Sequence, residues 1–172
     1  MTLAGDRYAL DPALAAEFDV DDFEREVSDA CRALRRQQQG AAAQLEQALR
    51  RYRGEFLDGE PVSDWHVEPR DRVQRLYLVA LMQLGEEWSR EQRYAKAVEA
   101  YRRVLARDEL HEEAIRALMR ALVETGERSQ AMRVYHRFAD RLRRELDADP
   151  DDETTRLLAR LQDGTATELR GA

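Results

Sequence analysis

The sequence has 172 residues, of which 43% are hydrophobic and 37% are charged, and its net charge is −7. This length suits a single domain with an apolar core, and the lack of any run of about 18 apolar residues excludes a membrane-spanning helix. Residues 1–31 alone carry a charge of −7, so residues 32–172 are neutral overall and offer no basic surface for nucleic acids.

The chain opens with DRYALDP at residues 6–12, where apolar and polar residues alternate, which predicts a short strand that ends at Pro12. This N-terminal stretch lacks the basic and apolar blocks of a signal peptide, so we expect a cytoplasmic protein. Apolar residues at helical spacing then predict two helices, over about residues 21–38 and 41–53, and a glycine ends each of them.

A segment rich in glycine, proline and aromatic residues, YRGEFLDGEPVSDWHVEPRDR, follows the second helix. Pro69 suits the first turn of a helix, so we predict that the next helix covers residues 69–91. The aromatic side chains of the loop allow two interpretations: exposed anchors for a partner, or internal plugs that hold the loop in place. We favour the second, with four residues as structural anchors of the loop: Phe56, Trp65, Arg70 and Arg72.

The remaining chain predicts four more helices, three of them over residues 94–107, 110–125 and 127–146. The last helix is predicted to begin with Asp149 as its cap and Pro150 at its first position, because acids and proline favour a helix start. It ends near residue 164.

An internal repeat relates these helices to one another. A shift of 34 residues places Ala97 on Ala131 and Tyr101 on Tyr135, and the first copy also carries Leu84-Gly85 in its first helix. This period is typical of tetratricopeptide repeats, in which each repeat is one helical hairpin. A weaker third copy around Ala48 is separated from the others by the loop, which is therefore an insertion within one solenoid. We predict an all-α, tetratricopeptide-like right-handed solenoid of about seven helices with a short N-terminal strand-like extension.

Three stretches together resemble a known family: YRGEFLDG, then a tryptophan followed by EPRDRVQRLYLVAL, and finally LRRELDADPDDETTRLLARL. They are similar to the bacterial transcriptional activator domain, the second domain of Streptomyces antibiotic regulatory proteins and related regulators. The resemblance implies three parts: a remnant of a wing strand with an acidic linker over residues 1–18, the activator domain over 19–163, and a frayed tail over 164–172.

The same resemblance implies a function. In that family a winged-helix DNA-binding domain precedes this one, and no counterpart of its recognition helix occurs in this sequence. We therefore expect no direct specific DNA binding by this chain and no membrane association. The partners that the resemblance implies are proteins: a second copy, the neighbouring DNA-binding domain and RNA polymerase.

Candidate residues for catalysis, cofactor binding or metal binding are lacking. The three histidines, His66, His111 and His136, show no metal-ligand spacing, and no phosphate-binding glycine loop or nucleophile motif occurs. Cys31, the single cysteine, lies in a predicted helix and is interpreted as a packing residue. We expect a protein that is not an enzyme and has no cofactor.

One possible binding site follows from the repeat register, which places Met82, Glu86, Arg116 and Arg120 on the concave groove. These residues favour a partner helix or an anionic ligand. The competing interpretation is that the two arginines pair with nearby acids inside the solenoid, such as Glu86, Glu112, Glu113 and Glu124. The corresponding alternative function is a stand-alone scaffold that binds a peptide or a small anionic signalling ligand such as a nucleotide.

Overall fold

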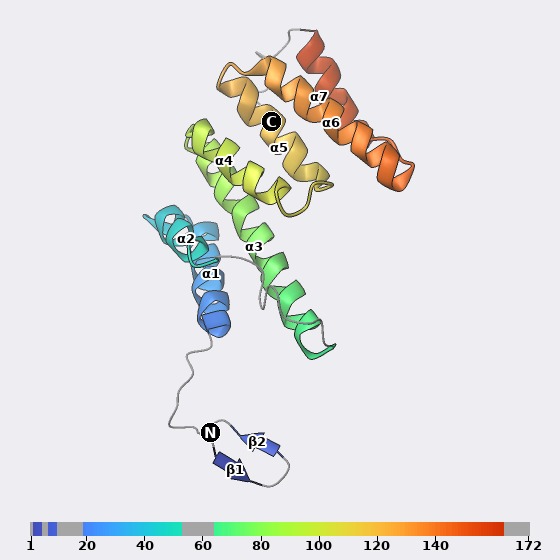
Figure 1. The fold of residues 1–172 in the computed structure, drawn as a ribbon. Coiled ribbons are helices and arrows are strands. Elements are labelled where there is room, and N and C mark those ends of the chain that lie inside the picture. The colour runs from blue at the N-terminus through green and yellow to red at the C-terminus, as the bar shows by residue number, and fades with distance from the viewer. Residues whose placement is uncertain (1, 5–6, 10–18, 53–63, 164–172) are drawn as a thin grey trace.

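The computed structural model describes residues 2–4, 7–9, 19–52 and 64–163 (Figure 1). The described residues form seven helices: α1 (Asp19–Arg35), α2 (Ala41–Leu49), α3 (Asp64–Arg90), α4 (Tyr94–Leu105), α5 (Glu112–Glu124), α6 (Arg128–Leu146) and α7 (Asp152–Gln162). Two short strands precede them, β1 (Thr2–Ala4) and β2 (Arg7–Ala9). None of the described helices combines the length and the apolar composition that crossing a membrane requires.

The N-terminal extension is a hairpin rather than a single strand. β1 and β2 pair antiparallel, with Thr2 opposite Ala9 and Leu3 opposite Tyr8. The predicted strand over residues 6–12 corresponds to β2, and the part of it from residue 10 onward lies outside the described residues.

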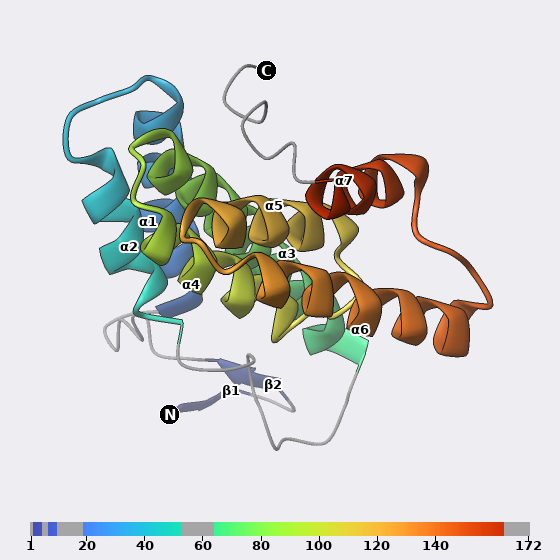
Figure 2. The ribbon, with the colours of Figure 1, turned by 90° about the horizontal axis from the view of Figure 1, so that it is seen from above.

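The helices form a solenoid in which each packs on its neighbours in the chain. The pairs α3–α4 and α5–α6 are the two repeats that the 34-residue period predicted, and the hairpin α1–α2 packs against α3 (Figure 1). In the view of Figure 2, α4 and α6 lie toward one side of α5, and α7 lies toward the other. The predicted all-α helical-hairpin solenoid is therefore confirmed.

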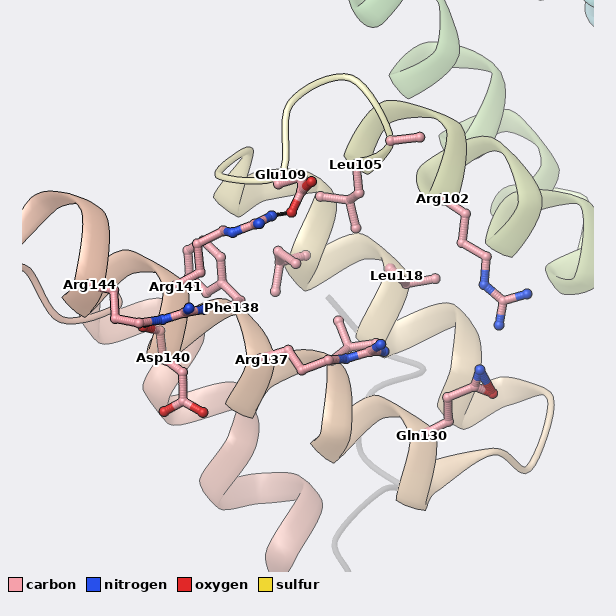
Figure 3. A pocket seen from close by; sticks show the side chains of 13 residues that line it. Arg102, Leu105, Glu109, Leu118, Gln130, Arg137, Phe138, Asp140, Arg141 and Arg144 are labelled. Atoms are coloured by element: carbon pink, nitrogen blue, oxygen red, sulfur yellow. Dashed lines mark hydrogen bonds and ion pairs between the residues drawn. The ribbon is translucent and has the colours of Figure 1, made fainter.

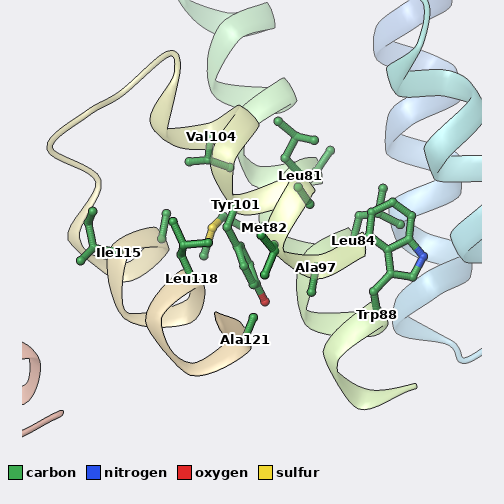
Figure 4. Close-up of a cluster of buried hydrophobic side chains, with 14 of the residues drawn as sticks. Leu81, Met82, Leu84, Trp88, Ala97, Tyr101, Val104, Ile115, Leu118 and Ala121 are labelled. Carbon is green, nitrogen blue, oxygen red and sulfur yellow. The ribbon is translucent and has the colours of Figure 1, made fainter. Parts of the chain in front are cut away.

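Small residues allow close packing inside the first repeat. Ala97 on α4 is completely buried, as is its counterpart Ala131 on α6. Tyr101 lies one turn after Ala97 and enters the space between α3 and α5, next to Ala121 (Figure 4). Gly85 on α3 leaves room for its ring, because a Cβ atom on Gly85 would lie only 2.5 Å from Tyr101 Cε1.

An aromatic cluster joins the first hairpin to the rest of the solenoid. The rings of Tyr52 and Tyr77 stack with their centroids 4.0 Å apart, and Phe23 of α1 lies 5.8 Å from Tyr52. Arg103 of α4 donates a hydrogen bond to the Tyr77 hydroxyl at 2.9 Å, and Arg107 lies over the Tyr52 ring. These side chains fill the junction between α2 and α3 on either side of the inserted loop.

Two predicted helix starts are wrong. α3 begins at Asp64, five residues before the predicted start at Pro69, so Pro69 is the sixth residue of the helix and not part of its first turn. α7 begins after Asp151, not at Asp149 and Pro150, since the Asp151 side chain accepts a hydrogen bond from the Thr154 amide at 2.9 Å.

Candidate functional site

The two arginines of the predicted concave groove join α5 to α7. Arg116 Nη1 donates to Asp151 Oδ2 at 2.9 Å and to Thr154 Oγ1 at 3.1 Å. Arg120 Nη2 donates to Glu153 Oε1 at 3.1 Å. The Arg116 side chain is only 14% exposed, and Thr154 is completely buried. These contacts therefore hold the last helix on the end of the solenoid.

The acids that pair with these arginines come from α7, not from the four acids considered from the sequence. Of those four, Glu112 belongs to the same network, because its Oε1 accepts a hydrogen bond from the Asp151 amide at 2.8 Å. The hydrogen bond from the Thr154 amide keeps the pKa of Asp151 below its ordinary value, and Arg116 lowers it further. Asp151 therefore stays ionised at neutral pH, with Arg116 as its partner.

The other two predicted groove residues lie in different surroundings. Met82 is buried in the core, whereas Glu86 lies at the surface, where neighbouring side chains shield part of its carboxylate from water. Partial burial raises the pKa of the Glu86 carboxyl, and the neighbouring Glu113 carboxylate raises it further. An anionic ligand at this face would meet these two carboxylates and would have to displace Asp151 and Glu153 from the arginines.

The predicted loop anchors are only partly described. Arg72 Nε donates to Glu24 Oε1 at 2.7 Å, which links α3 to α1. Arg70 lies close enough to the Tyr52 hydroxyl to lower its pKa, although burial raises that pKa more strongly. Trp65 belongs to the first turn of α3, and Phe56 lies outside the described residues. The structural role of the four anchors stays a prediction.

A groove of about 570 Å³ lies on the other side of the solenoid, between α4 and α6 and above α5 (Figure 3). We name it the α4–α6 groove. Its apolar lining combines residues of all three helices, and its walls are mostly charged. The floor consists of Ile115, Leu118, Val134 and Phe138, the rim at the end of α4 of Leu105 and Ala106, and the walls of Arg102, Glu109, Gln130, Arg137, Asp140, Arg141 and Arg144.

The four arginines of this groove differ in their partners. Arg141 pairs with Glu109 across the groove and with Glu145 at 3.0 Å on its own helix. Arg102 Nη2 lies 2.7 Å from the position that the Gln130 side-chain oxygen takes when the amide is turned to satisfy both of its neighbours. Arg144 Nε donates to the backbone carbonyl of Asp140 at 3.1 Å. Within the described part of the chain, neither Arg137 nor Arg144 has a carboxylate within salt-bridge distance. The groove therefore has an excess of positive charge on its α6 wall.

Sequence reasoning missed this groove, and none of the four predicted groove residues lines it. A signal was present, because the helix over residues 128–146 carries six arginines against two acids, whereas the rest of the chain is acidic overall. Three of them, Arg137, Arg141 and Arg144, follow the spacing that places residues on one helical face.

The described residues offer no group of three or more histidine, cysteine, aspartate or glutamate side chains that could hold a metal ion. Cys31 is buried in the core, and this burial raises the pKa of its thiol. Its protonated side chain is thus suited to packing, in agreement with its interpretation from the sequence.

Residues 18–162 match the sequence model of the family described as the bacterial transcriptional activator domain. The chain belongs to this family. The match covers α1 to α7 nearly completely, with the inserted loop included, and confirms the resemblance found in the sequence. No curated protein matches the chain.

Among solved structures, this activator domain is similar to the C-terminal TPR-containing domain of a Plasmodium falciparum protein described as FK506-binding. The TM-score is 0.61, the sequence identity is 15%, and the likeness covers 90% of this chain and 95% of the other. At this identity the similarity shows the tetratricopeptide-like fold alone.

Proposed function

We propose that this activator domain is a non-catalytic effector and assembly module of a bacterial transcriptional regulator. The observation that carries the proposal is the family match over residues 18–162, to which the tetratricopeptide-like solenoid adds a fold suited to protein binding. The module acts in the cytoplasm, where promoters and RNA polymerase are found.

The partners are other proteins, and the domain binds them through its solenoid surface. Three are proposed: a second copy of the domain, a DNA-binding domain of the same regulator, and RNA polymerase. Binding to one of them changes how the regulator as a whole engages a promoter. The chain contributes no chemical step, and DNA recognition belongs to the neighbouring domain.

The alternative function, a scaffold for a small anionic ligand, has lost its main support. It was based on Arg116 and Arg120, and both are held by carboxylates of α7. Releasing them would remove the contacts that hold the α7 N-terminus, and Glu86 and Glu113 would repel an anion at the same face.

The proposal is tested with the 172-residue chain and purified partners. Light scattering across a range of concentrations measures self-association, and immobilised chain is tested for retention of purified RNA polymerase and of a purified winged-helix domain from a regulator of this family. Saturable binding of at least one partner is expected. A chain that stays monomeric and retains neither partner would contradict the proposal.

A further inference from the structure

The geometry points to the α4–α6 groove as the docking site for an acidic, amphipathic segment of a different partner protein, not of a second copy of the domain. In this arrangement an apolar side chain of the partner lies on the floor of the groove, and its carboxylates meet Arg137 and Arg144. The inference rests on the proposed function and names the chemistry of the partner that the domain binds.

The depth of the groove comes from unequal helix lengths. α6 has 19 residues, whereas α4 has 12 and α5 has 13. The C-terminal turns of α6 therefore run past the end of α4, and the connection that carries Glu109 bends around them (Figure 3). The space left between the helices is walled by α6 on one side and by the end of α4 on the other.

The floor of the groove suits an apolar side chain. Ile115 and Leu118 of α5 and Phe138 of α6 form its base, and the half-buried Leu105 and exposed Ala106 form its rim at the end of α4. The base residues are fixed in the core and already packed. A partner side chain placed there would exclude water from the rim without any rearrangement of the helices.

The charges of the groove decide in favour of an extended acidic partner. Arg141 is neutralised by Glu109 and Glu145, whereas Arg137 and Arg144 on either side of it have no carboxylate at salt-bridge distance among the described residues. Asp140 also lines this wall and offsets one of the positive charges, so the wall keeps a net positive charge. Arg137 and Arg144 are seven positions apart on α6, a rise of about 10.5 Å along the helix. A segment with carboxylates two helical turns apart and an apolar residue between them matches both charges and the floor.

The test uses a fluorescein-labelled synthetic peptide in which two glutamates, seven residues apart, flank leucine and phenylalanine residues. Its binding to the 172-residue chain is followed by fluorescence anisotropy at low and high salt. A peptide with lysines in place of the glutamates is the control. We expect saturable binding of the acidic peptide, weakened by salt because the arginines are at the surface, and no binding of the lysine peptide.

Two double variants locate the site. Arg137→Glu with Arg144→Glu reverses the charge of the groove, and Arg36→Glu with Arg75→Glu makes the same change in net charge at exposed positions that do not line it. The first is expected to weaken binding of the peptide by about tenfold or more, and the second to leave it unchanged. All four arginines are exposed, and thermal melting by circular dichroism checks that both variants are folded.

A single variant at the rim tests the groove without altering the arginines. Ala106→Glu adds a carboxylate at the exposed end of α4 and is expected to weaken binding of the acidic peptide as well. Equal affinities of the groove variant and its control would overturn the inference, as would the absence of saturable binding to the unaltered chain.

Other occupants give different results. If inorganic phosphate or ATP competed with the peptide at equal concentration, the groove would be a site for small anions, and the inference would be wrong. If charge reversal in the groove abolished self-association seen by light scattering, the occupant would be a second copy. If the groove variant still retained RNA polymerase or the winged-helix domain, the proposed function would stand and the inference would fail.

Discussion

Gly85 of α3 faces the ring of Tyr101 of α4 so closely that even one added methyl group would meet it, at 2.5 Å from Cε1 and 2.8 Å from Cζ. The ring cannot swing away, because it is 2% exposed and Ser89 lies 3.4 Å from its hydroxyl. In the second repeat the glycine position is occupied by Met119, and the corresponding tyrosine, Tyr135, is only half-buried. The glycine is therefore needed where the tyrosine enters the core.

Gly85→Ala is expected to destabilise the domain. Alanine favours a helix over glycine by about 1 kcal/mol, but forcing a methyl group into a packed core costs about 1–3 kcal/mol. We expect the steric cost to exceed the gain in helix propensity, with a net loss of about 1–2 kcal/mol in the free energy of unfolding, measured by urea denaturation.

The same substitution in a Tyr101→Leu background serves as its control. A shorter side chain removes the clash, so Gly85→Ala should there be neutral or stabilising, and the two substitutions should be clearly non-additive. An increase in stability on Gly85→Ala alone would show that the ring moves aside freely.

The repeated hairpins could be predicted from local sequence, because their packing depends on the residue types at a few fixed positions of each repeat. Leu84-Gly85, Ala97 and Tyr101 define one hairpin, and the 34-residue shift finds the next. The start of α7 was predicted wrongly, since Asp149 and Asp151 are equally able to cap a helix. Asp151 is selected by tertiary contacts, the carboxylate of Glu112 on its amide and Arg116 on its side chain.

The candidate sites were less predictable because they depend on how distant helices meet. Helical spacing placed Arg116 and Arg120 on one face of their helix. It could not show that the start of α7, some 35 residues further along the chain, packs against that face and supplies the acids that pair with them. The α4–α6 groove depends on the relative lengths and separation of three helices. Only its charge, the arginine-rich composition of residues 128–146, could be read from the sequence.

Asp151→Ala should loosen α7. The substitution removes the cap of the helix, which contributes about 1 kcal/mol, and the ion pair with Arg116, a partly exposed pair that contributes about 1 kcal/mol. We expect a loss of about 1–2 kcal/mol in the free energy of unfolding and faster amide hydrogen exchange in α7. The adjacent Asp152→Ala is the matched control, because Asp152 is 91% exposed and pairs with Arg156 of its own helix. Similar losses in both variants would contradict the role assigned to Asp151.

Asp151 should also contribute to the stability of the domain at neutral pH and lose that contribution in acid. Its pKa is lower in the folded state than the ordinary value of 3.8, so the unfolded chain takes up a proton first as the pH falls. Its stabilisation is therefore complete above about pH 4–5 and is lost as the pH falls through the lowered pKa. The free energy of unfolding, measured from pH 7 to pH 2, should fall less steeply in Asp151→Asn than in the unaltered chain. Parallel curves would show that the pKa of Asp151 is the same in both states.

Glu86 should have the opposite effect. Partial burial and the Glu113 carboxylate raise its pKa in the folded domain, so the folded state binds the proton more tightly than the unfolded chain does. The ionised form therefore destabilises the fold at pH 7, and this cost disappears once the pH is below the ordinary pKa of about 4.3.

Glu86→Gln should raise the free energy of unfolding at pH 7 and have little effect near pH 3. Glu99→Gln, at an exposed position of α4, is the control for simple removal of a negative charge. An equal gain from both substitutions would assign the effect to net charge, and a loss of stability in Glu86→Gln would show that the carboxylate has a favourable partner on this face of the solenoid.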